Sequence, residues 1–240
     1  MKETNQEDNQ YSYKIKKDIY ADARNWYGAC HRFSHGTNWK KAMSSEVVSK
    51  IAGKTEKEAF KFLIPFLKEK YIKEKDALDS YRIFLNEEFE NKFQKSCDKI
   101  VQVMGKPLYR NDFTIYITTL PRGPYNKETG SLWICLNWAD PIRCFLHELC
   151  HFQFIHYWAQ NKKSKVNKLS REEFEFLKES LTIILDKDFE PIIQSPDRGY
   201  SIHQEFRKEL KRYWTKTRDF EKLVDFGVET VPEYLAKTLK

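Results

Sequence analysis

The stretch from Asp140 to Phe152 constrains this chain more than any other, because it predicts a helix and also places reactive side chains on it. Asp140 suits the N-cap of a helix, and Pro141 suits the first helical position, where its missing N–H costs no hydrogen bond. No Gly or Pro interrupts the next twenty residues. His147 and His151 stand four residues apart, so they project from one face in the middle of this helix.

Two imidazoles at this spacing can hold one Zn²⁺ ion. Glu148 follows the first of them, and its carboxylate can accept a proton from a metal-bound water. The pattern therefore predicts a zinc site with an adjacent general base. The alternative is a buried helix whose histidines have no functional meaning.

The same stretch resembles the zincin metallopeptidases, whose longer pattern asks for uncharged residues around the two histidines. Phe145, Leu149, Cys150 and Phe152 satisfy that pattern, whereas Gln153 stands where it asks for an apolar residue. The resemblance covers about residues 131–186. It implies a zincin-like α+β fold, mostly helical, with a small antiparallel or mixed sheet beside the motif helix.

The composition fits a folded, largely helical protein of one compact domain. Of the 240 residues, 40% are hydrophobic, and Gly and Pro number eight each. We expect a flexible tail over 1–10, a helical N-terminal region over 11–107 and a zincin-like catalytic region over 108–240. No apolar run reaches the length of a membrane span, and the N-terminus lacks the apolar core of a secretory signal. Five cysteines without paired spacing favour reduced thiols, so we expect a cytoplasmic protein.

The net charge of +7 raises the question of an anionic partner. The lysines are scattered among glutamates along the predicted helices, which is typical of a solvated surface. Nucleic acid is therefore an alternative partner, and a peptide or protein substrate is the expected one.

Local signals mark the ends of several elements. Thr55 and Glu58 form a capping box that opens a helix to about Tyr71. A longer helix is predicted over 75–104, because apolar residues recur at helical intervals until Gly105 stops them.

Two strands are predicted before the motif helix, over 113–118 and 131–137. In zincins a strand in this position lies at the edge of the sheet along the active-site cleft, where it can bind an extended peptide. The pattern of apolar residues fits equally well a strand that is paired on both sides.

A catalytic zinc normally takes three protein ligands and leaves a fourth position to water. His156 follows His151 by five residues, which rotates it about 140° away on the same helix and excludes it. Ser170 and Glu173 form a second capping box and open a helix over about 171–186.

On that helix Glu179 lies between the apolar residues Phe176 and Ile183, where a carboxylate needs a cation or hydrogen-bond donors. The run from Glu179 to Thr182 also resembles the ligand helix of the gluzincins, a resemblance that implies Glu179 as the third ligand. Glu175 is the alternative ligand. Thermolysin-like members carry an Asp four residues after that Glu, where this chain has Ile183, so Asp186 is the remaining candidate for a second carboxylate.

Tyrosine and histidine side chains elsewhere in the chain are candidates for further roles. Tyr200 and His203 are candidate donors to the oxyanion of a tetrahedral intermediate, and either could instead serve packing or capping. His31 and His35 also have helical ligand spacing, but no acidic or cysteine pair completes a second site.

Together these features predict a zinc-dependent, gluzincin-like metallopeptidase. Zn²⁺ would be held by His147, His151 and Glu179, with Glu148 activating the zinc-bound water for peptide hydrolysis. Two alternatives remain: a non-catalytic zinc-containing binding or regulatory module, which could contact nucleic acid through its basic surface, and a structural helical protein without metal.

Overall fold

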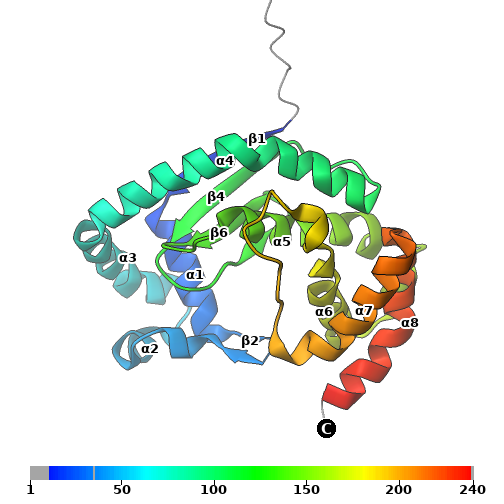
Figure 1. The fold of residues 1–240 in the computed structure, drawn as a ribbon. Coiled ribbons are helices and arrows are strands. Elements are labelled where there is room, and N and C mark those ends of the chain that lie inside the picture. Colours follow the sequence, from blue (N-terminus) through cyan, green and yellow to red (C-terminus); the bar gives the residue numbers. More distant parts are fainter. Residues whose placement is uncertain (1–10, 35, 239–240) are drawn as a thin grey trace, which may run out of the picture.

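The computed structural model of this chain describes residues 11–34 and 36–238 (Figure 1). The predicted tail 1–10 and His35 lie outside the described residues. The fold is α+β and mostly helical with a small mixed sheet, as the sequence predicts. The α-helices are α1 (Ile19–His31), α2 (Ser45–Ile51), α3 (Glu56–Lys73), α4 (Lys75–Met104), α5 (Pro141–Phe154), α6 (Arg171–Ser180), α7 (Gln204–Thr217) and α8 (Phe220–Thr238).

The sheet has the strand order β1-β4-β6-β5. Its strands are β1 (Ser12–Lys17), β4 (Asp112–Thr118), β6 (Ser131–Cys135) and β5 (Tyr125–Asn126). β1 and β6 both run parallel to β4, and β5 runs antiparallel to β6. A separate hairpin joins β2 (Phe33–Ser34) to β3 (Thr37–Asn38).

The strand before the motif helix does not form the edge of the sheet. β6 pairs with β4 on one side and with β5 on the other, and the backbone N–H of Trp133 donates to the carbonyl of Pro124. The segment between β4 and β6 supplies this extra strand, which is too short to give a period-two signal. The N-terminal region is likewise not wholly helical, because it supplies β1.

The two faces of the sheet carry different helices. Alternate residues of β4 and β6, including Ile115, Ile117 and Ile134, enter the main core with α4 and α5. Trp133 lies on the other face, where its indole N–H donates to the Ala21 carbonyl of α1. A smaller core joins α1, α2 and α3. Residues from both predicted regions, 11–107 and 108–240, contribute to the same main core.

Capping residues fix the ends of the helices. In α3 the Thr55 backbone N–H donates to the Glu58 carboxylate at 2.9 Å, which completes the predicted capping box. α4 ends at Gly105, whose φ of 65° is costly for other residues. The short 3₁₀-helices are η1 (Trp39–Ala42), η3 (Lys165–Lys168), η4 (Leu181–Ile184), η5 (Lys187–Phe189) and η6 (Ser201–His203). The segment η2 (Ile155–Ala159), which follows α5 directly, is a π-helix.

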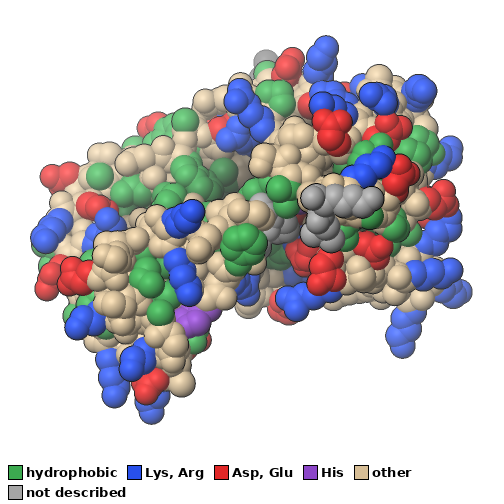
Figure 2. All heavy atoms as spheres, turned by 90° about the horizontal axis from the view of Figure 1, so that it is seen from below, with side chains coloured by type: hydrophobic (Ala, Val, Ile, Leu, Met, Phe, Trp, Pro, Cys, Tyr) green, Lys and Arg blue, Asp and Glu red, His purple; other side chains and the backbone are tan. Residues whose placement is uncertain are grey.

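Among the described residues, no helix combines the length and the apolar character that crossing a membrane requires. Basic and acidic side chains are intermixed on the face seen in Figure 2. This mixture agrees with the scattering of lysines among glutamates in the sequence.

Candidate metal centre

The motif helix begins where the sequence predicts. Asp140 caps α5, with its Oδ1 accepting from the backbone N–H of Arg143 at 3.1 Å, and Pro141 occupies the first turn. His151 is buried and His147 is partly buried on this helix. Their ring centroids are 4.5 Å apart, so both imidazoles project from the same face.

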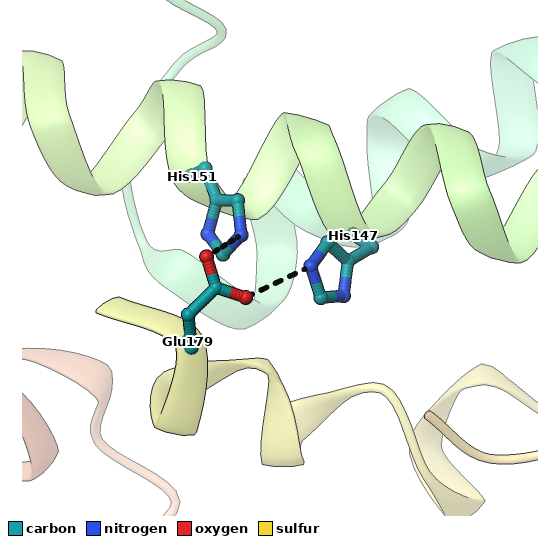
Figure 3. A group of neighbouring side chains, drawn as sticks. All are labelled: His147, His151 and Glu179. Atoms are coloured by element: carbon teal, nitrogen blue, oxygen red, sulfur yellow. Dashed lines mark ion pairs between the residues drawn. The ribbon is translucent and has the colours of Figure 1, made fainter. Parts of the chain in front are cut away.

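Glu179 meets the two histidines from the end of α6 (Figure 3). Its Oε2 lies 3.4 Å from His147 Nε2, and its Oε1 lies 3.2 Å from His151 Nε2. The carboxylate is buried like His151, with 5% of Glu179 exposed, whereas His147 is more open to solvent. α6 ends at Ser180 and continues as the tighter turn η4, so the helix predicted to run to residue 186 changes its geometry just after the carboxylate.

These three side chains could hold a metal ion. Each offers one ligand atom, and the atoms lie within 4.8 Å of one another. In a tetrahedral zinc site with bonds of about 2.0–2.1 Å, ligand atoms stand about 3.3 Å apart. The shortest nitrogen-to-oxygen distances, 3.4 Å from His147 to Oε2 and 3.2 Å from His151 to Oε1, are close to that spacing but end on different oxygens of Glu179. Two imidazoles with a carboxylate form a donor set that suits Zn²⁺.

The two histidines differ in charge preference. Burial lowers the pKa of His151 to about 4, which keeps its ring neutral and its lone pair available to a cation. Burial acts in the same direction on His147, but the carboxylates of Asp197 and Glu179 outweigh it and raise its pKa well above the usual value. Without a bound cation, His147 therefore holds a proton more readily than His151.

The second carboxylate of the site is Asp197, which sequence reasoning missed. Its Oδ2 lies 3.2 Å from His147 Nδ1, the nitrogen on the far side of the ring from Glu179. A carboxylate in this position fixes the tautomer and orientation of a metal-binding histidine. The prediction of Asp186 is wrong, because that carboxylate pairs with Lys211 at 2.9 Å. Asp197 lies in a loop, where no periodicity points toward the motif helix.

The loop that carries Asp197 is fixed from two sides. Oδ2 of Asp140 accepts from the backbone N–H groups of Gln194 and Ser195, so the N-cap of α5 also anchors the loop. From α7, Arg207 donates to the Asp197 carbonyl at 2.6 Å and to the Glu179 carbonyl at 3.0 Å. Arg207 is buried, and its hydrogen bonds join the segment that carries Asp197 to the one that carries Glu179.

Glu148 is on α5 beside the triad. Among the residues that the structure describes, its Oε2 is a buried oxygen without a hydrogen-bond partner. Burial raises the pKa of Glu148 to about 7, with His147 acting in the opposite direction. A carboxylate with these properties can accept and return a proton near neutral pH.

Tyr200 and His203 lie next to each other near the triad, with their ring centroids 5.7 Å apart. Burial raises the pKa of Tyr200, and the charges of Glu179 and Glu148 act in the same direction, so this phenol shares their environment. The ring of His203 is fully buried and packs edge-on against Phe176 with centroids 4.5 Å apart. Their catalytic roles stay predictions.

Two further groups near the triad were not singled out in the sequence. Lys178 is buried, and its Nζ lies 3.3 Å from Glu179 Oε1 and 3.0 Å from the hydroxyl of Tyr125. The ring of Tyr125 stands 5.6 Å from that of His151. The sequence gives no signal of this burial, since lysines are normally surface residues.

Arg122 is a second buried cation of this region, at the end of the segment that follows β4. Its Nη1 donates to Oδ1 of Asn25 at 2.8 Å, which anchors it to α1. Burial lowers the pKa of Arg122 to about 10, with the charge of Arg32 acting in the same direction and that of Glu148 in the opposite one.

The remaining candidates lie elsewhere. His156 lies in η2 with its ring against Tyr109, and Glu175 pairs with Lys178 at 2.7 Å. His31 ends α1, where its Nδ1 lies 2.9 Å from the Tyr27 carbonyl. The unexpected Gln153 is fully buried, and its amide bonds the backbone of Tyr109 and Pro107, which explains a polar residue at an apolar position.

No family model matches this chain, and no curated protein or solved structure matches it either. The functional argument therefore depends on the residues of the site itself.

Proposed function

We propose that this chain is a zinc-dependent peptidase. The observation that carries the proposal is the convergence of His147 and His151 from α5 with Glu179 from α6, at distances suited to one ion. Glu148 stands next to this group with a buried carboxylate oxygen that accepts no hydrogen bond from the described residues. Zn²⁺ bound there would lower the pKa of a water molecule and polarise a peptide carbonyl.

The protein's own residues would supply the remaining steps. Glu148 would take a proton from the attacking water and return it to the leaving amine. Asp197 would hold His147 in one orientation through Nδ1 while Nε2 faces the ion. Burial and the charges of Glu179 and Glu148 raise the pKa of Tyr200, which keeps its hydroxyl protonated. This hydroxyl would donate a hydrogen bond to the developing oxyanion.

The five cysteines are all free, which supports the expected reducing, cytoplasmic compartment for the proposed enzyme. A peptide or protein chain is the proposed substrate.

The test begins with elemental analysis of protein purified without added metal, which should give one zinc per chain. A peptide library then identifies a substrate that the parent protein cleaves. Glu148→Gln keeps the shape of the side chain but removes the base, so it should retain zinc and lower turnover by about 10²–10⁴-fold or more. Glu175→Gln, a change on the partly exposed side of α6, is the matched control and should cleave at the parental rate.

A Glu148→Gln variant that cleaves like the parent contradicts this mechanism. A parent that binds zinc yet cleaves nothing in the library favours a non-catalytic zinc-containing module. Salt-dependent retention of nucleic acid by such a parent would identify its partner.

A further inference from the structure

Lys178 places a buried ammonium group directly against the third candidate ligand. Only 4% of its surface is exposed, and its Nζ lies 3.3 Å from Glu179 Oε1. Consecutive residues on a helix point about 100° apart, so this contact requires the long side chain to bend toward its neighbour. An isolated buried ammonium would be costly, so its surroundings must compensate for the loss of water.

Among the described residues, three oxygen atoms lie within 3.3 Å of this ammonium. They are the hydroxyl of Tyr125 at 3.0 Å, Oε2 of Glu175 at 2.7 Å and Oε1 of Glu179 at 3.3 Å. Tyr125 belongs to β5, whereas both glutamates belong to α6. The cation is thus held from the sheet and from the helix, which fixes its position beside Glu179.

The two oxygens of Glu179 consequently have different surroundings. Oε1 faces His151 Nε2 at 3.2 Å and also the ammonium of Lys178, whereas Oε2 faces His147 Nε2 at 3.4 Å. A contact between an ammonium and a carboxylate oxygen is charge-assisted and strong in a buried environment. Lys178 therefore competes with an ion for Oε1 of Glu179.

We propose that Lys178 makes Glu179 bind the metal ion through one oxygen and so keeps a coordination position open for water. The inference rests on the metal site of the proposed function. A carboxylate that binds through both oxygens would fill the position that a catalytic zinc leaves open. Lys178 acts through Glu179 and is therefore a positioning residue. The alternative is that Lys178 serves only to neutralise Glu175.

The cobalt-substituted protein tests this proposal, because four-coordinate Co²⁺ absorbs visible light much more strongly than five-coordinate Co²⁺. Lys178→Met keeps the length of the side chain and removes the ammonium. The variant should lose intensity in the visible bands, since both oxygens of Glu179 become available. It should also bind Zn²⁺ about tenfold more tightly, because a positive charge next to the ion is gone.

Glu175→Gln is the matched control, since it leaves the Lys178–Glu179 contact in place, and it should give the parental cobalt spectrum. An unchanged spectrum in Lys178→Met, or a weaker zinc affinity, overturns the proposal. If Lys178→Met does not fold, X-ray absorption of the zinc-loaded parent decides. One carboxylate oxygen at bonding distance supports the proposal, and two overturn it.

The same experiments separate this proposal from the proposed function. A parent that binds neither Co²⁺ nor Zn²⁺ overturns the metal site and the role of Lys178 together. A parent that binds both ions and shows the expected change in Lys178→Met, but cleaves no peptide, overturns the peptidase activity alone.

Discussion

Glu179 and Asp22 are two carboxylates buried in different parts of the molecule, and their pKa values move in opposite directions. Glu179 is 5% exposed and Asp22 is fully buried, so loss of water favours the neutral acid in both. For Asp22 this effect prevails and raises the pKa to about 6. For Glu179 the contacts with His151 and His147 outweigh burial and lower the pKa well below its usual value.

The difference comes from the charge of the partners rather than from the number of hydrogen bonds. Asp22 accepts from the hydroxyls of Thr118 and Thr119 and from the backbone N–H of Thr119, all of them neutral. These bonds join α1 to the end of β4 and have an evident structural role. Glu179 faces two imidazoles and an ammonium. A buried carboxylate surrounded by cationic or metal-binding groups is thus the one to examine for function.

The largest effect is expected from removing Glu179. Glu179→Ala should weaken zinc affinity by about three orders of magnitude, because a catalytic zinc site would lose one of three protein ligands. Glu175→Ala, one turn earlier on α6, should bind zinc like the parent. Isothermal titration measures the zinc affinity of both variants. Parental affinity in Glu179→Ala would show that Glu179 and Glu175 do not differ in metal binding.

For Asp22 we expect an effect on the pH dependence of stability rather than on metal binding. Its pKa is about 6 in the folded protein and about 3.9 in an unfolded chain, so the folded state holds the proton more tightly. The contribution of Asp22 to stability therefore decreases as pH rises through this window, by about 2 kcal/mol between pH 4 and pH 7.

Asp22→Asn removes this titration. Urea unfolding of the parent and of the variant at several pH values gives the difference in their free energies of unfolding. That difference should change by about 2 kcal/mol over the window, in the direction that favours the variant at higher pH. A difference that stays constant with pH would mean that the surroundings of Asp22 do not raise its pKa.

A smaller effect is expected at Asp197, which touches a candidate ligand without being one. Asp197→Asn retains an acceptor for His147 Nδ1 but loses the negative charge, and zinc affinity should fall about 10–100-fold. Asp186→Asn is the matched control, because its carboxylate pairs with Lys211. Equal zinc affinities in the two variants would remove Asp197 from the site.

The parts of the molecule that the sequence predicts are those with local causes. The bounds of α4 follow from apolar spacing and from Gly105, and the start of α5 follows from Asp140 and Pro141. The proximity of Glu179 to the two histidines is also anticipated, because a carboxylate between apolar residues on a helix requires a partner.

The parts that escape prediction depend on contacts between distant segments. β5 consists of two residues that become a strand because β6 offers them hydrogen bonds. Asp197 reaches His147 because Asp140 and Arg207 fix its loop from opposite sides. Lys178 looks like a surface lysine until Tyr125 of β5 is placed against it.

The pairing of β1 with β4 also sets an order in which the chain can fold. Ser12 lies opposite Asp112, so about one hundred residues must be enclosed before this ladder closes. Contacts of such long range slow folding, and during synthesis β1 has to wait until β4 has been made. The helices α1 to α4 can form locally in that interval, because their caps and apolar stripes lie within the intervening segment. The candidate metal ligands come later still in the chain, on α5 and α6, so they are made only after every strand of the main sheet.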